Sequence, residues 1–116
     1  VHAPRYVVTG PPNSGKSTYV RQQARDGDLV WDFDQLASTL SLKGKERPRG
    51  ADDSRGPWPW PTMKAMLVMR DALVAWLAET DLSVRVYLIV RDPADARAIA
   101  STIRAELVEW SRDRWA

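Results

Sequence analysis

Short apolar runs alternate along the chain with longer stretches whose apolar residues recur every three or four positions. Residues 5–10 (RYVVTG), 28–34 (DLVWDFD) and 84–90 (VRVYLIV) are β-branched or aromatic runs that predict strands. Their consecutive apolar residues are typical of strands covered on both faces, as parallel strands under helices are. Residues 106–110 (ELVEW) predict a fourth strand, at an edge of the sheet.

The stretches between these runs predict helices. One extends from Gly15 to about Arg25, and a short one runs from Asp34 to about Ser41. Residues 61–81 predict the longest helix, with Thr62 as its N-cap, and residues 93–105 predict another, with Pro93 in the first turn. The apolar stripe of the longest helix is formed by Met66, Met69, Leu73, Trp76 and Leu77. The inward positions of the last helix are Ala96, Ile99, Ala100 and Ile103.

This alternation of strands and helices indicates an α/β fold, with a short parallel sheet of about four strands and helices on both faces. With 116 residues the chain has room for one modest core, so residues 1–116 are expected to form one domain. The glycines and prolines of residues 43–61 exclude long regular structure and predict a long, mobile loop. Trp31 and Trp76 fit positions in the core, and Trp110 fits the edge strand.

Composition narrows the class of protein further. The chain is 44% hydrophobic and 28% charged, which is typical of a globular protein and excludes a disordered one. No apolar run approaches the roughly 20 residues that a membrane-spanning helix needs, so no membrane partner is expected. The chain has no cysteine and opens on no signal-peptide pattern, and both features favour the cytoplasm.

Charge is distributed unevenly, although the net charge is only +2. Residues 43–55 (KGKERPRGADDSR) concentrate basic side chains on a stretch with almost no apolar content. Such a segment could attract a phosphorylated or nucleic-acid substrate through long-range electrostatics. A solvated loop explains the same composition equally well.

The clearest chemical signal is TGPPNSGKST, residues 9–18, in which Gly10, Gly15, Lys16 and Ser17 fit the phosphate-loop pattern G-x-x-x-x-G-K-[ST]. The pattern lies between a predicted strand and a predicted helix, where glycines let successive N–H groups converge on phosphate oxygens. The lysine can reach the β- and γ-phosphates, and the serine hydroxyl can bind Mg²⁺. The predicted nucleotide-binding residues are Gly10, Pro11, Pro12, Asn13, Ser14, Gly15, Lys16, Ser17 and Thr18.

In this context the chain resembles the P-loop kinase group, to which polynucleotide, adenylate and shikimate kinases belong. VVTGPPNSGKSTYVRQQA, followed by an acid-ended second strand, looks most like the polynucleotide-kinase-like branch. It also looks like small ATP-binding proteins of bacteriophages and prophages. The resemblance covers residues 5–40 and implies a three-layer P-loop NTPase fold that binds ATP with Mg²⁺. It further implies a lid over the phosphoryl group, for which the 43–61 loop is a candidate.

Charged residues that follow the strands are the candidates for catalysis, because ligands in open parallel sheets lie beyond the carboxyl ends of the strands. The resemblance implies that Asp34 orients and deprotonates the acceptor hydroxyl, whereas a helix N-cap is the alternative role for this aspartate. If the strand persists that far, Asp32 shares the face of Asp34 and could help to hold the metal. Arg91 is a catalytic candidate beside Lys16, and Asp92 is a metal candidate or a helix cap.

Three further residues are substrate candidates. Arg70 lies at the edge of an apolar helix stripe, where it could contact an anionic ligand or form a structural ion pair. Trp58 and Trp60, in PWPWP, could stack on a base or pack on the core.

The leading functional hypothesis is a Mg²⁺-dependent kinase that transfers the γ-phosphoryl group of ATP to a hydroxyl of a nucleotide, polynucleotide or small metabolite. One alternative is a nucleotide-binding switch or assembly module that hydrolyses slowly or not at all. Another is an NTPase that is completed by a partner, which could supply an arginine in trans.

Overall fold

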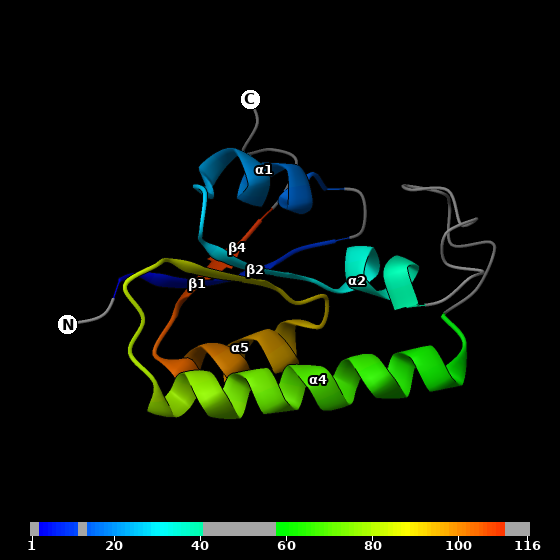
Figure 1. The fold of residues 1–116 in the computed structure, drawn as a ribbon. Helices are drawn as coiled ribbons and strands as arrows, with labels where there is room; N and C mark the ends of the chain where they lie inside the picture. The colour runs from blue at the N-terminus through cyan, green and yellow to red at the C-terminus, as the bar shows by residue number, and fades with distance from the viewer. Residues whose placement is uncertain (1–2, 12–13, 41–57, 111–116) are drawn as a thin grey trace.

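A computed structural model describes residues 3–11, 14–40 and 58–110 (Figure 1). The elements, in chain order, are β1 (Arg5–Thr9), α1 (Lys16–Gln23), β2 (Leu29–Asp32), α2 (Phe33–Leu40), α4 (Trp60–Glu79), β3 (Val86–Ile89), α5 (Pro93–Ile103) and β4 (Glu106–Glu109). Each apolar run that predicted a strand contains one. The basic stretch of residues 43–55 lies outside the described residues.

The four strands form one parallel sheet in the order β2-β3-β1-β4. The predicted α/β class with a short parallel sheet is therefore confirmed, and β4 lies at an edge as expected. Strand β1 pairs with β3 on one side, where Val7 faces Leu88, and with β4 on the other, where Val7 faces Leu107. Both edges of β1 are satisfied, so the middle of this strand is the centre of the fold.

Helices lie on both faces of the sheet (Figure 1). Because successive strand residues point to opposite faces, Val7 packs toward α4 and α5 while Val8 packs toward α1. The four predicted inward residues of α5 are all buried in the core between this helix and the sheet. The core on the α1 side is smaller and richer in aromatic rings, with Tyr6 stacked on Tyr87 at 5.2 Å between ring centroids.

A buried arginine joins the start of β1 to the ends of two helices. Arg5 is only 5% exposed, and its guanidinium donates to the carbonyl oxygens of Leu77 (2.6 Å) and Ile103 (3.2 Å). It also donates to the carbonyl oxygen of Thr80. These carbonyls lie at the C-terminal ends of α4 and α5, where unpaired C=O groups carry partial negative charge. Arg5 therefore caps both helices and fixes them beneath the sheet.

A second polar cluster ties the amino end of β3 to the turn before β2. The carboxylate of Asp28 accepts from the backbone N–H of Arg25 (2.9 Å) and of Arg85 (3.1 Å), and from Arg85 Nε (3.2 Å). Arg85 also donates to the carbonyl oxygen of Gln23 at 2.8 Å. These contacts, led by the Arg25 N–H, hold the pKa of Asp28 below its ordinary value.

Several predicted boundaries are wrong. Strand β2 ends at Asp32 and α2 begins at Phe33, so Asp34 lies in the first turn of the helix rather than at its N-cap. For the same reason Asp32 and Asp34 do not share a strand face. Helix α4 begins at Trp60, so the end of the predicted 43–61 loop is helical, and Thr62 lies inside the helix.

The tryptophans separate into two groups. Trp31 is 7% exposed in the core and Trp110 is 7% exposed beside β4, whereas the prediction that Trp76 is a core residue is wrong, because it is 49% exposed. Met69, from the same predicted stripe, is 39% exposed. Helix α4 packs on α2 and α5. Within the described ranges, no helix is long and apolar enough to cross a membrane.

Replacing Arg5 with methionine should lower the free energy of unfolding by about 3 kcal/mol, because buried helix-end carbonyls lose their donor. Urea denaturation followed by circular dichroism measures the change. Arg97→Met, on the exposed side of α5, is the matched control and should change stability by less than about 0.5 kcal/mol. An equal loss in the two variants would contradict the capping role of Arg5.

Candidate functional site

The carboxyl ends of β1 and β3 are adjacent, and the chain leaves them in opposite directions (Figure 1). From β1 it enters α1 on one face of the sheet, and from β3 it enters α5 on the other. In folds of this class, ligands bind at the carboxyl edge of the sheet, where successive strands lead to opposite faces. The Thr9 hydroxyl donates to the carbonyl oxygen of Arg91 at 3.4 Å and so joins the two strand ends.

The phosphate-loop sequence lies at this edge. Gly15 has a φ of 90°, a left-handed conformation that favours glycine, and α1 begins at the next residue, Lys16. The N–H groups of the first turn of a helix have no intrahelical partner, and here no side chain caps them either. They therefore carry partial positive charge. Ser17 and Thr18 belong to this turn, Gly10, Pro11 and Ser14 flank it in the loop, and Pro12 and Asn13 lie outside the described residues.

Strand β4 touches the phosphate loop through Trp110. A Cβ atom added to Gly10 would lie 2.4 Å from the carbonyl oxygen of Trp110, so only glycine fits at this contact. The Trp110 backbone N–H donates to the carbonyl oxygen of Thr9 at 2.7 Å, and its indole Nε1 donates to that of Ser14 at 3.0 Å. The two donors of Trp110 therefore hold both ends of the loop.

Trp110 also contacts the helix that follows the loop. Its indole stacks on the ring of Tyr19, with 4.1 Å between the centroids and 24° between the planes. A stacked aromatic pair contributes about 1 kcal/mol beyond the area that it buries. The strand, the loop and α1 thus meet at one side chain, which the sequence placed in the edge strand without predicting these contacts.

Lys16 lies at the centre of the predicted charged residues. Its Nζ donates to the carbonyl oxygen of Pro11 at 3.0 Å, so the side chain folds over the loop. Burial lowers the pKa of Lys16, the negative charges of Asp34 and Asp32 oppose this shift, and the positive charge of Arg91 adds to it. The structure therefore brings these four predicted residues within electrostatic reach of one another.

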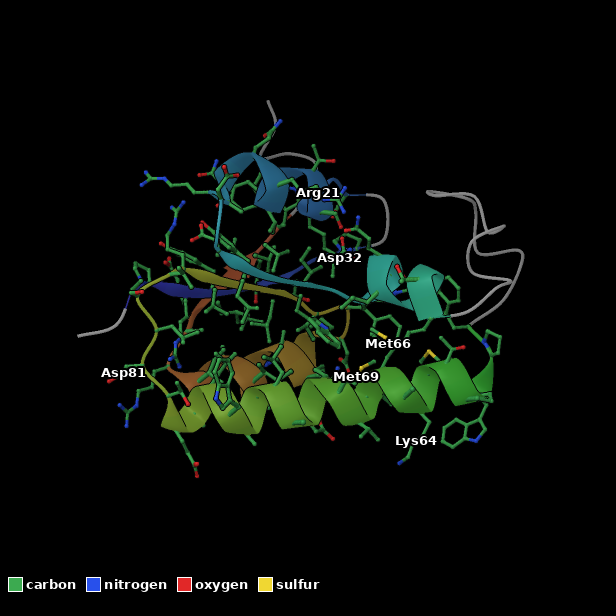
Figure 2. The ribbon with its side chains drawn as sticks, viewed as in Figure 1. Arg21, Asp32, Lys64, Met66, Met69 and Asp81 are labelled. Atoms are coloured by element: carbon green, nitrogen blue, oxygen red, sulfur yellow. The ribbon has the colours of Figure 1, made fainter. Side chains whose placement is uncertain are left out.

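Asp32 is held by an arginine from α1 (Figure 2). Its Oδ2 lies 3.5 Å from a terminal nitrogen of Arg21, and its side chain is 11% exposed, against 42% for the arginine. Arg21 also donates to Oε1 of Gln35, on α2. Sequence reasoning missed Arg21, although it lies one helical turn after Ser17 and therefore on the same face of α1.

Asp34 is paired with one of the two predicted substrate tryptophans. Trp58 Nε1 donates to Asp34 Oδ1 at 3.1 Å, and the indole packs at the border of the core. Trp60 is 67% exposed in the first turn of α4, so the two rings of PWPWP lie in different environments. One carboxylate oxygen of Asp34 is engaged while the residue remains exposed.

The remaining predicted residues have structural partners. Asp92 is the N-cap of α5, where its side chain accepts from the N–H of Ala94 at 3.0 Å. Arg91, just before it, is exposed. Arg70 forms an ion pair with Asp95 at 3.6 Å, the structural alternative that its sequence position suggested.

Among the described residues, no three or more histidine, aspartate or glutamate side chains gather as a metal-binding cluster. A Mg²⁺ ion commonly keeps several waters and takes only one or two protein ligands together with phosphate oxygens. Ser17, in the first turn of α1, and Asp32, at the end of β2, offer oxygen donors of this kind. The residues present therefore fit a metal ion that arrives with a nucleotide.

A groove of about 470 Å³ extends from Asp32 along the edge of the sheet. It is lined by Arg21, Val30, Asp32, Gln35, Leu36 and Thr39, which come from α1, β2 and α2. The polar side chains converge around the Arg21 ion pair, and Leu36 and Val30 supply apolar walls. No local sequence pattern signals this groove, because its lining residues come from three elements.

No family model matches the chain, and no curated protein or solved structure gives a match either.

If the loop binds a nucleotide, as its sequence pattern predicts, replacing Trp110 with phenylalanine should weaken that binding about fivefold, because the loop loses the indole donor to Ser14 while the aromatic ring is kept. Titration calorimetry with Mg²⁺ and ATP measures the affinity, and urea denaturation measures stability separately.

Trp31→Phe is the matched control, since the buried indole N–H of Trp31 has no acceptor among the described residues. This control should leave the affinity unchanged. If Trp110→Phe lowers stability without lowering the affinity, the tryptophan is structural only and does not position the loop.

Lys16→Met should stabilise the nucleotide-free protein slightly at neutral pH, because it removes a charge that burial disfavours. The lowered pKa means that the unfolded chain holds this proton more tightly. The stability of the wild type therefore rises with pH between the lowered pKa and the ordinary value of 10.5, and this rise should be absent in the variant. Unfolding curves from pH 7 to about 10 test the difference, with Arg97→Met as the control for loss of a positive charge.

Proposed function

We propose that the chain is a P-loop protein of the kinase type, which binds ATP with Mg²⁺ at the carboxyl edge of its sheet and transfers the γ-phosphoryl group to a hydroxyl. The observation that carries this proposal is the left-handed Gly15 directly before Lys16 at the uncapped N-terminus of α1, where the charges of Asp32, Asp34 and Arg91 also act on the lysine. A glycine turn with an incidental lysine would not require acids from the next strand and helix to gather there.

Each part of the loop has a role in binding the nucleotide. The N–H groups of the first turn of α1 bind phosphate oxygens, and the left-handed Gly15 turns them toward the ligand. The ammonium of Lys16 exchanges the Pro11 carbonyl oxygen for the β- and γ-phosphates. Ser17 and Asp32 hold the metal directly or through water, and bound Mg²⁺ would neutralise charge on the phosphates.

Asp34 is the base in this proposal. Trp58 fixes one of its carboxylate oxygens, which leaves the other to accept the proton of the acceptor hydroxyl. The hydroxyl oxygen forms a bond to the γ-phosphorus as the bond to the bridging oxygen breaks, and ADP leaves. Arg91 supplies positive charge at the end of β3, where negative charge develops during the transfer.

The groove beside Asp32 is the candidate site for the acceptor. Arg21, Gln35 and Thr39 present hydrogen-bonding groups along it, and Asp34 lies in the same helix, α2, as two of them. This lining suits a polar acceptor such as a nucleotide, a polynucleotide end or a small metabolite. The resemblance to P-loop kinases implies the same classes of acceptor.

A nucleotide-binding module without transfer is the second candidate. The observation that favours it is that both acids already have partners, Arg21 for Asp32 and Trp58 for Asp34. In that case the nucleotide would act as a switch, or a partner protein would complete an NTPase.

Lys16→Ala should abolish binding of ATP with Mg²⁺ in calorimetry, because the loop loses its charge toward the phosphates. Asp34→Asn should keep ATP binding within about twofold while reducing transfer by at least about a hundredfold, the usual contribution of a general base. Transfer is measured with γ-labelled ATP and a panel of nucleotide, polynucleotide and metabolite acceptors.

Asp26→Asn, an exposed aspartate in the turn after α1, is the matched control and should behave like the wild type. Tight binding without transfer to any acceptor would overturn the kinase proposal in favour of the binding module. Failure of the wild type to bind ATP would overturn both.

A further inference from the structure

Helix α4 carries apolar side chains on its outer side as well as where it packs, with the exposed charges of Lys64 and Asp71 along one flank. One side contributes Met66 and Leu77 to the core, together with the half-buried Leu73. On other sides Val68 is 54% exposed and Trp76 is 49% exposed. Between and beside them lie three exposed alanines, Ala65, Ala72 and Ala75. We call these five exposed residues the outer face of α4.

The outer face has no cover within the described structure. Helix α4 is the outermost layer of the fold, with α2 and α5 on the side toward the sheet (Figure 1). A continuous exposed apolar strip of this kind marks an interaction surface. Its cover must be long, straight and apolar, which describes another helix.

The charges at the two ends of the outer face indicate which helix covers it. Lys64, which projects from the side of α4 away from the sheet, lies near its start (Figure 2), and Glu79 is its last residue. At 100° per residue the two side chains lie about 60° apart around the helix, so both border the same face. A face with a positive start and a negative end is complementary to itself when two copies run antiparallel.

We propose that the outer face of α4 binds the same face of a second copy of this chain, in an antiparallel pair about a two-fold axis near Ala72. This register places Lys64 of each copy opposite Glu79 of the other, which gives two equivalent ion pairs. A parallel pair would set Lys64 beside Lys64 and Glu79 beside Glu79. The arrangement is an isologous dimer, the commonest form of association between identical chains.

The sizes of the side chains fit the same register. Val68 of one copy lies opposite Ala75 of the other, and Trp76 lies close to Ala65. Large side chains therefore meet small ones, which lets the helix surfaces interdigitate. Ala72 at the axis allows the two backbones to approach closely. The pairing leaves α1 and the phosphate loop, on the opposite face of the sheet, uncovered (Figure 1).

Sedimentation velocity over a range of protein concentrations tests association without reference to any nucleotide activity. The wild type should show a monomer–dimer equilibrium. Lys64→Glu and Glu79→Lys should each weaken the dimer by about tenfold, because each turns two attractive pairs into repulsive ones. The double variant Lys64→Glu/Glu79→Lys restores opposite charges across the interface and should recover wild-type association.

Ala72→Glu adds a like charge from each copy at the axis, next to the exposed Asp71, and should leave only monomer. Ala98→Glu, at an exposed position of α5, is the matched control and should dimerise like the wild type. Circular dichroism melting curves verify that every variant is folded. A wild type that stays monomeric at all concentrations would overturn the proposal. It would also be overturned by a double swap that associates no better than the single swaps, or by an Ala72→Glu variant that still dimerises.

Discussion

The confinement of β1 on every side is the constraint on which the rest of the fold depends. Parallel strands pair with both of its edges, and helices cover both of its faces, so its middle must be apolar. Only its two ends can hold polar side chains, and they hold Arg5 and Thr9. The first anchors two helices at the amino edge of the sheet, and the second joins the ends of β1 and β3 at the carboxyl edge. The phosphate loop, which follows β1, therefore begins at a strand that is held on every side.

The phosphate loop is supported from a strand that is distant in sequence and adjacent in space. Trp110 donates to the carbonyl oxygens of Thr9 and Ser14, so the loop conformation depends on the pairing of β4 with β1. Such support matters because a phosphate loop binds through backbone N–H groups, whose directions cannot be adjusted by side-chain rotation. A loop held at both ends presents those groups in place before a ligand arrives, which reduces the ordering cost of binding.

Local sequence patterns predicted the structural features that depend on residues close together in the chain. The strand runs, the inward face of α5 and the cap of that helix by Asp92 follow from periodicity and short-range hydrogen bonding. The pattern of α4 misplaced Trp76, because apolar residues also lie on its outer side and the pattern does not reveal which side faces the core. The expectation that the charged residues gather near Lys16 came from strand order alone, since parallel strands end at one edge.

Partners across long sequence separations were beyond the reach of local reasoning. The carbonyl partners of Arg5 lie 72, 75 and 98 positions away, and nothing near Arg5 signals them. The pairing of Trp58 with Asp34 has the same origin, because α2 and α4 meet only in the folded chain. The groove that includes Arg21 and Gln35 likewise arises where three elements converge. In each case packing decides which polar groups meet.

The position of Arg5 also gives the domain a polarity. Its buried positive charge lies at the C-terminal, partly negative ends of α4 and α5 and offsets them. At the opposite ends, Asp92 caps α5, whereas no side chain caps the start of α4 or of α1, and these starts lie toward the carboxyl edge of the sheet (Figure 1). One helix dipole from each layer is thus left without a side-chain cap at this edge. An anion approaching the molecule meets a field that the scaffold sets, before it touches any side chain.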